Sequence, residues 1–129
     1  MSIFNSIFGE PKSNSNSSNI NWTPMEHLGQ IEEIIELSEQ MPVIIFKHST
    51  RCSISRMALK NFENEYDLGE NISAYFLDLI SFREVSNEIA SRFSVVHQSP
   101  QLLLIAGGKL VYDVSHSSID AQELKSKIQ

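Results

Sequence analysis

The sequence predicts an α/β domain with a four-stranded mixed sheet, flanking helices and an extra helix on its N-terminal side. Two unbroken apolar runs, residues 43–46 and 102–105, are typical of strands covered on both faces. Between them, apolar residues recur at three- and four-residue steps, which predicts helices. The pair Gly107-Gly108 predicts a tight hairpin after the second run.

The composition limits the classes of protein to consider. With 129 residues and 41% apolar side chains, the chain is expected to form one domain with its own core. A net charge of −6 disfavours a nucleic-acid partner. The single cysteine excludes an internal disulfide and fits a reducing cytoplasm. No stretch resembles a membrane span or a signal peptide, so we expect a cytoplasmic protein with no membrane contact. We also expect a monomer.

Residues 1–21 are predicted to be a flexible tail and linker ahead of a domain at 22–129. Ile3, Phe4, Ile7 and Phe8 would share one side of a short helix, but eight residues cannot hold a helix alone. This segment is either a frayed terminus or a docking or membrane-touching segment, and it has no Lys or Arg to favour a membrane. Residues 11–21 are rich in Ser and Asn, as linkers are.

The first predicted helix begins at a capping box, with Thr23 as the cap, Pro24 at the first helical position and Glu26 three residues after the cap. It ends before Pro42. Four apolar residues are expected to face inward from it: Leu28, Ile31, Ile34 and Ile35.

The middle of the chain predicts strand, helix, strand and helix. The strand at 43–46 leads into a helix whose buried face is expected to comprise Ile54, Met57, Ala58, Phe62 and Tyr66. Gly69 and Asn71 indicate a turn, and residues 73–79 a second apolar strand. A second capping box, at residues 81–84, precedes a helix with three inward residues: Val85, Ile89 and Phe93.

The last part of the chain predicts the hairpin and a final helix. After the strand at 102–105, residues Leu110, Tyr112 and Val114 are expected to share one face of a fourth strand. Ser117 or Ser118 can cap the last helix, with three residues facing the core: Ala121, Leu124 and Ile128. The first two strands, joined by a helix, should be parallel, and the last two antiparallel. This is the element order of the thioredoxin-like fold.

Cys52 lies on the turn from the first strand into a helix. There it would face unpaired helix N–H groups, whose partial positive charge favours a thiolate. The alternative is a small buried cysteine that fills a gap in the core. The neighbours of Cys52 are mostly polar, which favours the reactive interpretation: His48, Ser49, Thr50, Arg51, Ser53 and Ser55.

Two features resemble a known family. Cys52-Ser53-Ile54-Ser55 follows the first strand, where thioredoxins and glutaredoxins place C-x-x-C, and Ser55 occupies the position of the second cysteine. Ser99-Pro100 precedes the third strand, where that superfamily has a cis-proline facing the active cysteine. Together, "FKHSTRCSIS" and "HQSPQ" resemble the YtxJ-type monothiol bacilliredoxins over roughly residues 22–129.

The resemblance implies a cytoplasmic oxidoreductase that acts on bacillithiol mixed disulfides. Its partners would be bacillithiol, as co-substrate, and bacillithiolated proteins, with no other cofactor. Cys52 and Ser55 would be the catalytic residues. The substrate-binding residues would be Arg51, His48, Ser99 and Pro100.

The sulfur count defines the expected mechanism. With one cysteine, Cys52 can only form a mixed disulfide and wait for an outside thiol to release it. Ser55 either donates a hydrogen bond to the Cys52 sulfur or is plain helix surface. Arg51 and Lys47 either stabilise the thiolate and bind a carboxylate-bearing thiol, or are solvated loop charges.

Other functions stay open at this point. A metal site is disfavoured, because His48 stands with one cysteine and the other histidines are scattered. A one-cysteine thiol peroxidase usually has Thr three residues before its cysteine, where this chain has Ser49. A thioredoxin-like binding module that has lost its redox function is the remaining alternative.

Overall fold

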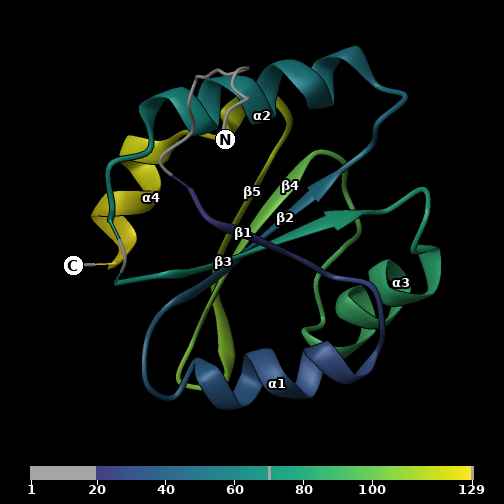
Figure 1. Ribbon diagram of the computed structural model, residues 1–129, viewed down its shortest axis with the longest axis vertical. Helices are drawn as coiled ribbons and strands as arrows, with labels where there is room; N and C mark the ends of the chain where they lie inside the picture. The colour runs from purple at the N-terminus through teal and green to yellow at the C-terminus, as the bar shows by residue number, and fades with distance from the viewer. Residues whose placement is uncertain (1–19, 70, 129) are drawn as a thin grey trace, which may run out of the picture.

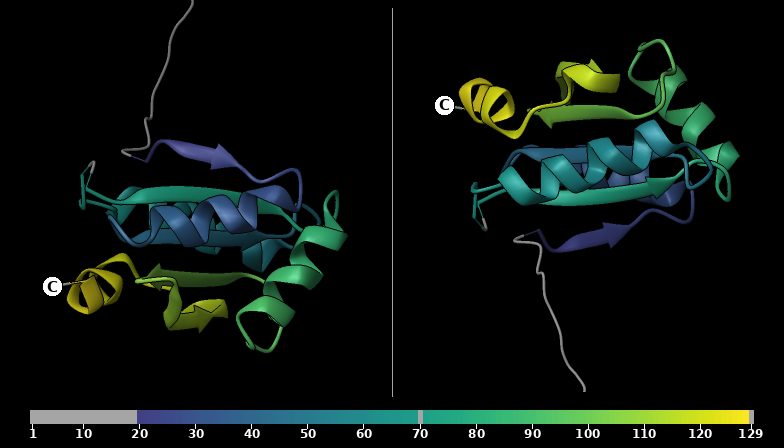
Figure 2. Two further views of the ribbon diagram at one scale, coloured as in Figure 1. Left: turned by 90° about the horizontal axis from the view of Figure 1, so that it is seen from below. Right: turned by 90° about the horizontal axis from the view of Figure 1, so that it is seen from above.

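Five strands form one mixed sheet in the order β1-β3-β2-β4-β5. The structure is a computed structural model that describes residues 20–69 and 71–128, and the tail predicted at 1–21 lies almost wholly outside them. The strands are β1 (Trp22–Pro24), β2 (Val43–His48), β3 (Ser73–Asp78), β4 (Gln101–Ala106) and β5 (Lys109–Ser115). Figure 2 shows them edge-on, with β1 at one edge and β5 at the other. The sheet therefore has five strands in the described residues, one more than predicted.

Helices cover both faces of the sheet. They are α1 (Gly29–Leu37), α2 (Ser53–Glu65), α3 (Arg83–Arg92) and α4 (Ala121–Ile128), with a short 3-10 helix, η2 (His116–Ser118), before α4. Figure 1 shows α2 and α4 on one side, and α1 and α3 on the other. Two apolar clusters fill these layers, because β2 and β4 are buried on both faces and their residues alternate between the clusters.

The extra strand, β1, replaces the predicted capping box. Residues 22–24 pair in parallel with β3, and Met25 N–H donates to Phe76 O at 2.8 Å. Pro24 is tolerated there because β1 is an edge strand, where a missing N–H costs little. The side chain of Gln30 organises the following turn: its Oε1 accepts from Glu26 and His27 N–H, and its Nε2 donates to Pro24 O.

The extra N-terminal helix is consequently not confirmed. A helix, α1, does precede β2, but it begins at Gly29 and connects two strands of the sheet. Ile31 and Ile34 are buried as predicted, whereas Leu28 precedes the helix and is exposed. The second capping box is also wrong: no side chain caps α3, and the Ser81 hydroxyl donates to Asp78 Oδ2 at 3.0 Å.

The predicted hairpin between β4 and β5 is confirmed. Gly107 and Gly108 have φ values of 60° and 78°, which a two-residue turn of this kind requires and which glycine adopts without a steric penalty. A bulge in the pairing next to Leu104 shifts the register of β5. Leu110 therefore packs in a different cluster from Tyr112 and Val114, so the three do not share one face as predicted.

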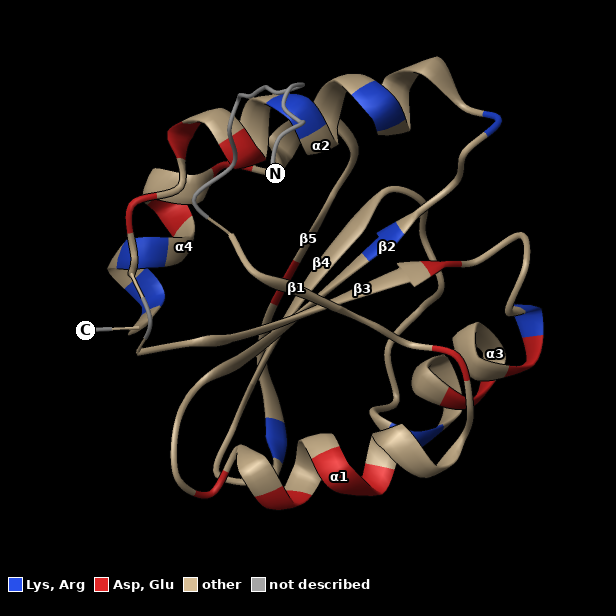
Figure 3. Ribbon diagram, viewed as in Figure 1, with Lys and Arg blue, Asp and Glu red and all other residues tan. Residues whose placement is uncertain are grey.

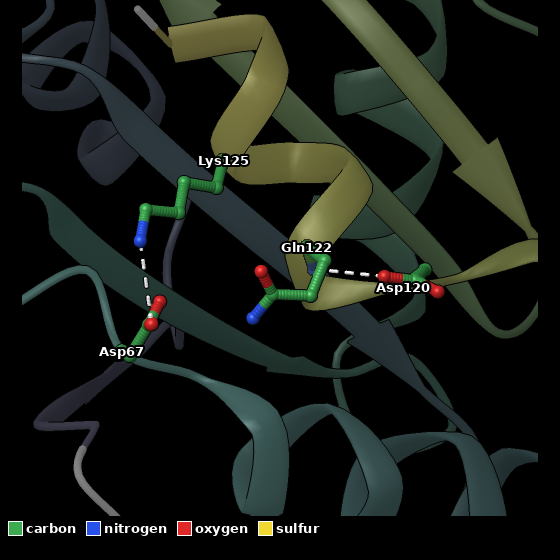
Figure 4. Close-up of polar contacts among 4 residues, drawn as sticks. All are labelled: Asp67, Asp120, Gln122 and Lys125. Carbon is green, nitrogen blue, oxygen red and sulfur yellow. Dashed lines mark hydrogen bonds and ion pairs between the residues drawn. The ribbon is translucent and has the colours of Figure 1, made fainter.

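Helix α4 is capped by Asp120 rather than by Ser117 or Ser118. The Asp120 Oδ1 atom accepts from Gln122 N–H at 2.8 Å (Figure 4) and from Glu123 N–H at 3.1 Å. The two serines belong to η2, one turn earlier. Figure 4 also shows Lys125 of α4 paired with Asp67, which follows α2. Ala121 and Leu124 are buried, as predicted.

Asp120→Ala is expected to destabilise the protein by about 1 kcal/mol, because two N–H groups at the start of α4 lose their acceptor. Urea unfolding checks this as a shift in midpoint at constant slope. Ser117→Ala is the matched control and should change stability by less than about 0.5 kcal/mol. Equal effects of the two substitutions would contradict the assignment of the cap.

Candidate active site

Cys52 is placed as the sequence predicts, directly before α2. Its backbone is extended, with φ −108° and ψ 121°, and its carbonyl accepts the first helical hydrogen bond, from Arg56 N–H. The side chain is partly exposed. Because the first N–H groups of a helix have no partner within it, the residue at this position faces the positive end of α2.

The Ser99-Pro100 segment lies at the same end of the central strands β2 and β4 as the loop that leads to Cys52. Lys47 near the end of β2 pairs with Gln101 at the start of β4, so the residues just beyond these two positions emerge together. The Ser99-Pro100 peptide bond is cis, which confirms the prediction. The Pro100 carbonyl accepts from His116 N–H at 3.0 Å, which ties this segment to the start of η2.

Ser99 has unused hydrogen-bonding capacity. Its hydroxyl oxygen is buried without a partner among the described residues. Buried hydroxyl groups are normally hydrogen-bonded, and an unsatisfied one requires an explanation. Because this oxygen is buried, a substrate could contact it only after the Ser99 side chain rotates.

Ser55 and His48 form a buried pair behind the cysteine. The Ser55 hydroxyl lies 2.8 Å from His48 Nδ1 and accepts from Ser49 N–H at 3.0 Å, and Ser55 has no exposed surface. Among the described residues, the Ser55 hydroxyl makes no hydrogen bond to the Cys52 sulfur, contrary to one of the two predictions. Ser55 is also not on the exposed surface of the helix, which was the other. The hydroxyl instead braces the loop between β2 and α2.

His48 is the last residue of β2 and is only 5% exposed. Its ring packs on Phe76, with centroids 5.4 Å apart, and burial lowers its pKa. The ring therefore favours the neutral form in the folded protein. This position suits a residue that supports Ser55 more than one that contacts a substrate.

Lys47 is not a solvated loop charge, which was one of the two alternatives that the sequence left open. It lies inside β2 with no exposed surface, and its Nζ atom is 2.7 Å from His97 Nδ1 and 3.0 Å from Gln101 Oε1. Gln101 also accepts from Gln98 N–H and donates to Val96 O. This network joins the middle of the sheet to the segment that carries Ser99 and Pro100.

Lys47→Met is expected to change the pH dependence of stability. Burial lowers the pKa of Lys47 from 10.5 to about 8, so above about pH 8 the unfolded chain holds a proton that the folded protein has released. The contribution of Lys47 to the free energy of unfolding of the wild type therefore increases as pH rises above about 8. It decreases again as pH falls back to about 8. The variant lacks this term.

Urea unfolding between about pH 7 and 9.5 checks the prediction. The stability of the wild type relative to Lys47→Met should rise by about 1–2 kcal/mol over this range. The window ends there because burial raises the pKa of Tyr66 and Tyr75 to about 12, which lowers stability at higher pH in both proteins. Lys109→Met, at an exposed position, is the control and should show no such trend. If the difference in free energy of unfolding between the wild type and Lys47→Met were also independent of pH, the prediction would be contradicted.

Several Lys and Arg residues stand close to Cys52 along the chain, although the protein is acidic overall. Figure 3 shows Lys and Arg in the loop before α2 and in the first half of α2, whereas α1 carries mainly Asp and Glu. Arg51 is exposed beside Cys52, and Arg56 Nη1 donates to Thr50 O at 3.1 Å.

The apolar face predicted for α2 is partly wrong. Phe62 and Tyr66 are buried, but Ile54 is 58% exposed and Met57 is 66% exposed. Their side chains line a groove of about 390 Å³ that runs from Ser53 of α2 to Ser117 of η2. The periodic pattern identified the helix correctly but could not distinguish a core face from an exposed apolar groove.

Two residues that contact the buried Lys47 at this end of the central strands were missed in the prediction from sequence. His97 and Gln101 hold Lys47, and the available signal was a lysine that directly continues an apolar strand, since a buried ammonium needs partners. Within the described ranges, no group of three or more His, Cys, Asp or Glu side chains is arranged to hold a metal ion. None of the helices described is long and apolar enough to cross a membrane.

Comparisons with known proteins agree with this geometry. Residues 23–124 match the family described as Monothiol bacilliredoxin BrxC. A solved thioredoxin-fold protein, provisionally described as an oxidoreductase, is 28% identical, with a TM-score of 0.73 over 84% of this chain and 94% of that one.

Two solved thioredoxins are also similar. The thioredoxin of Malassezia sympodialis is 16% identical, with a TM-score of 0.66 over 88% of this chain and 92% of that one. Mitochondrial thioredoxin 3 of Saccharomyces cerevisiae is 16% identical, with a TM-score of 0.66 over 87% of this chain and 97% of that one. At these identities they show the fold alone. The family match and the fold together support a thiol oxidoreductase role.

Proposed function

The chain belongs to the monothiol bacilliredoxin family, and we propose that it removes bacillithiol, or a similar low-molecular-weight thiol, from protein mixed disulfides through Cys52. One observation carries this proposal. Cys52 stands alone at the start of α2, and the buried Ser55 occupies the place from which a second thiol would resolve an intermediate. Such a site can take up one thiol but cannot close a disulfide by itself.

The reaction has two exchange steps. The Cys52 thiolate attacks the bacillithiol sulfur of a modified protein, a new S–S bond forms, the old one breaks, and the protein leaves as a thiolate. A second bacillithiol thiolate then attacks the bacillithiol sulfur held on Cys52. Bacillithiol disulfide leaves, and the Cys52 thiolate is restored. Electrons balance, because the second bacillithiol is the reductant.

The surrounding residues take supporting roles in this proposal. Arg51, exposed next to Cys52, would bind a carboxylate of the low-molecular-weight thiol. Ser99 would pair its backbone with the bound chain, beside the cis Pro100. Ser55 and His48 would hold the loop that presents Cys52. We place the reaction in the cytoplasm, with bacillithiolated proteins as partners and no cofactor beyond the thiol.

Intact-mass measurement of the reduced protein after incubation with bacillithiol disulfide tests the proposal. One bacillithiol should be added at Cys52, and a second thiol should remove it. Glutathione disulfide at the same concentration is the control for the identity of the thiol. A protein that forms no adduct with either disulfide would be the redox-inactive binding module. Rapid consumption of hydrogen peroxide without exchange would instead indicate a peroxidase.

A further inference from the structure

The groove between α2 and η2 is an apolar surface with no partner among the described residues. Its side chains come from Ile54, Met57, Ala58 and Asn61 of α2, from His116, and from Ile119 behind η2. Asp, Glu, Lys and Arg are all absent from its lining, which also includes Ser53 and Ser117. Its volume, about 390 Å³, lies in the range of roughly 300–1,000 Å³ typical of binding pockets.

We propose that residues 3–8 of this same chain dock in this groove and cover it. The segment has four large apolar side chains, Ile3, Phe4, Ile7 and Phe8, and no charged side chain. An uncharged apolar segment matches an uncharged apolar groove, because neither partner has to desolvate a charged side chain on docking.

The length of the chain outside the described residues permits this docking. Residue 20, where the description begins, belongs to the same apolar cluster as Phe62 and Tyr66 in the second half of α2. The groove lies on the other side of α2, next to η2, which follows β5 at the opposite edge of the sheet from β1, so the chain has to cross α2, a helix of 13 residues and about 20 Å, to reach it. Residues 9–19 would be the tether, and a flexible linker of that length has a root-mean-square span of about 17–20 Å.

A tether that is long enough to reach the groove makes weak docking sufficient. The effective concentration of the segment at the groove is then in the mM range. An interaction with a Kd of about 1 mM would thus be about half occupied without any partner.

Paramagnetic relaxation in the full-length chain tests the proposal. In a Cys52→Ser background, Ser2→Cys carries a nitroxide as the sole thiol label, and the amides of Met57, Ala58 and Asn61 are observed by ¹⁵N NMR. The same label in a Phe4→Ser/Phe8→Ser variant is the matched control. It keeps the tether and its length and removes only the apolar side chains.

We expect several-fold stronger relaxation at the groove amides with the natural tail than with the Phe4→Ser/Phe8→Ser tail. Amides of α1, on the other face of the sheet, should be unaffected in both proteins. Equal relaxation in the two proteins would overturn the proposal. So would relaxation that appears only when labelled and ¹⁵N-enriched chains are mixed, because the occupant would then be a second copy. The readout involves no thiol chemistry, so its result is independent of the proposed function.

Discussion

Cys52→Ala is expected to abolish thiol–disulfide exchange and to leave the protein folded. Cys52 is the only sulfur nucleophile that a single-cysteine chain can offer, so its removal should reduce the release of bacillithiol from a modified protein to the uncatalysed rate. The loss should be on the order of 10³-fold or more. Stability should change by less than about 1 kcal/mol, because the side chain is partly exposed and makes no cap hydrogen bond.

The measurement pairs an exchange assay with urea unfolding of the same samples. Ser53→Ala, at the exposed neighbouring position, is the control and should retain exchange activity. If Cys52→Ala still released bacillithiol faster than buffer, the sulfur would have no part in the mechanism.

Ser55→Cys is expected to convert the protein into one that sheds bound bacillithiol without an added thiol. Residues three apart on a helix have Cβ atoms about 5–6 Å apart, and a disulfide needs about 3.5–4.5 Å, so the first turn of α2 has to tighten. Resolution would then be intramolecular. An effective thiol concentration of about 0.1–1 M, against about 1 mM in solution, predicts an adduct lifetime shorter by roughly 100-fold or more.

The structure adds a condition to this prediction. The Ser55 hydroxyl points to His48 and Ser49, so the new sulfur has to rotate away from them to reach Cys52. Intact mass over time, starting from the purified adduct, gives the lifetime. Ser53→Cys supplies a second thiol without the geometry of one helical turn and should leave no intramolecular disulfide to Cys52. If the Ser55→Cys adduct is as persistent as that of the wild type, residue 55 cannot face Cys52.

The buried strands could be predicted from the sequence because their signals are local. The runs at 43–46 and 102–105 are apolar at every position, and both are central strands. The strand β1 was missed because only three residues form it, and they match a helix start in their composition. What makes it a strand is pairing with β3, some fifty residues away, which no local pattern records.

The placement of Cys52 and Pro100 could be predicted, but their surroundings could not. Hydrophobic periodicity assigned Ile54 and Met57 to the core, since an apolar groove and a core face give the same spacing. The burial of Lys47 was not predicted because the apolar run ends at Phe46, whereas pairing with β4 continues to Lys47. Which partners would surround a buried ammonium depends on how residues 47, 97 and 101 meet in space.

The contact between Lys47 and Gln101 also limits how this sequence can diverge. The two residues are direct partners across β2 and β4, and the ammonium donates to the Gln101 amide at 3.0 Å. Changing one alone leaves a buried polar group without its partner, which costs about 1–3 kcal/mol, whereas replacing both with apolar residues of similar shape can be nearly neutral. Among homologues, positions 47 and 101 should therefore change together, and an alignment in which they vary independently would show that other residues satisfy each group.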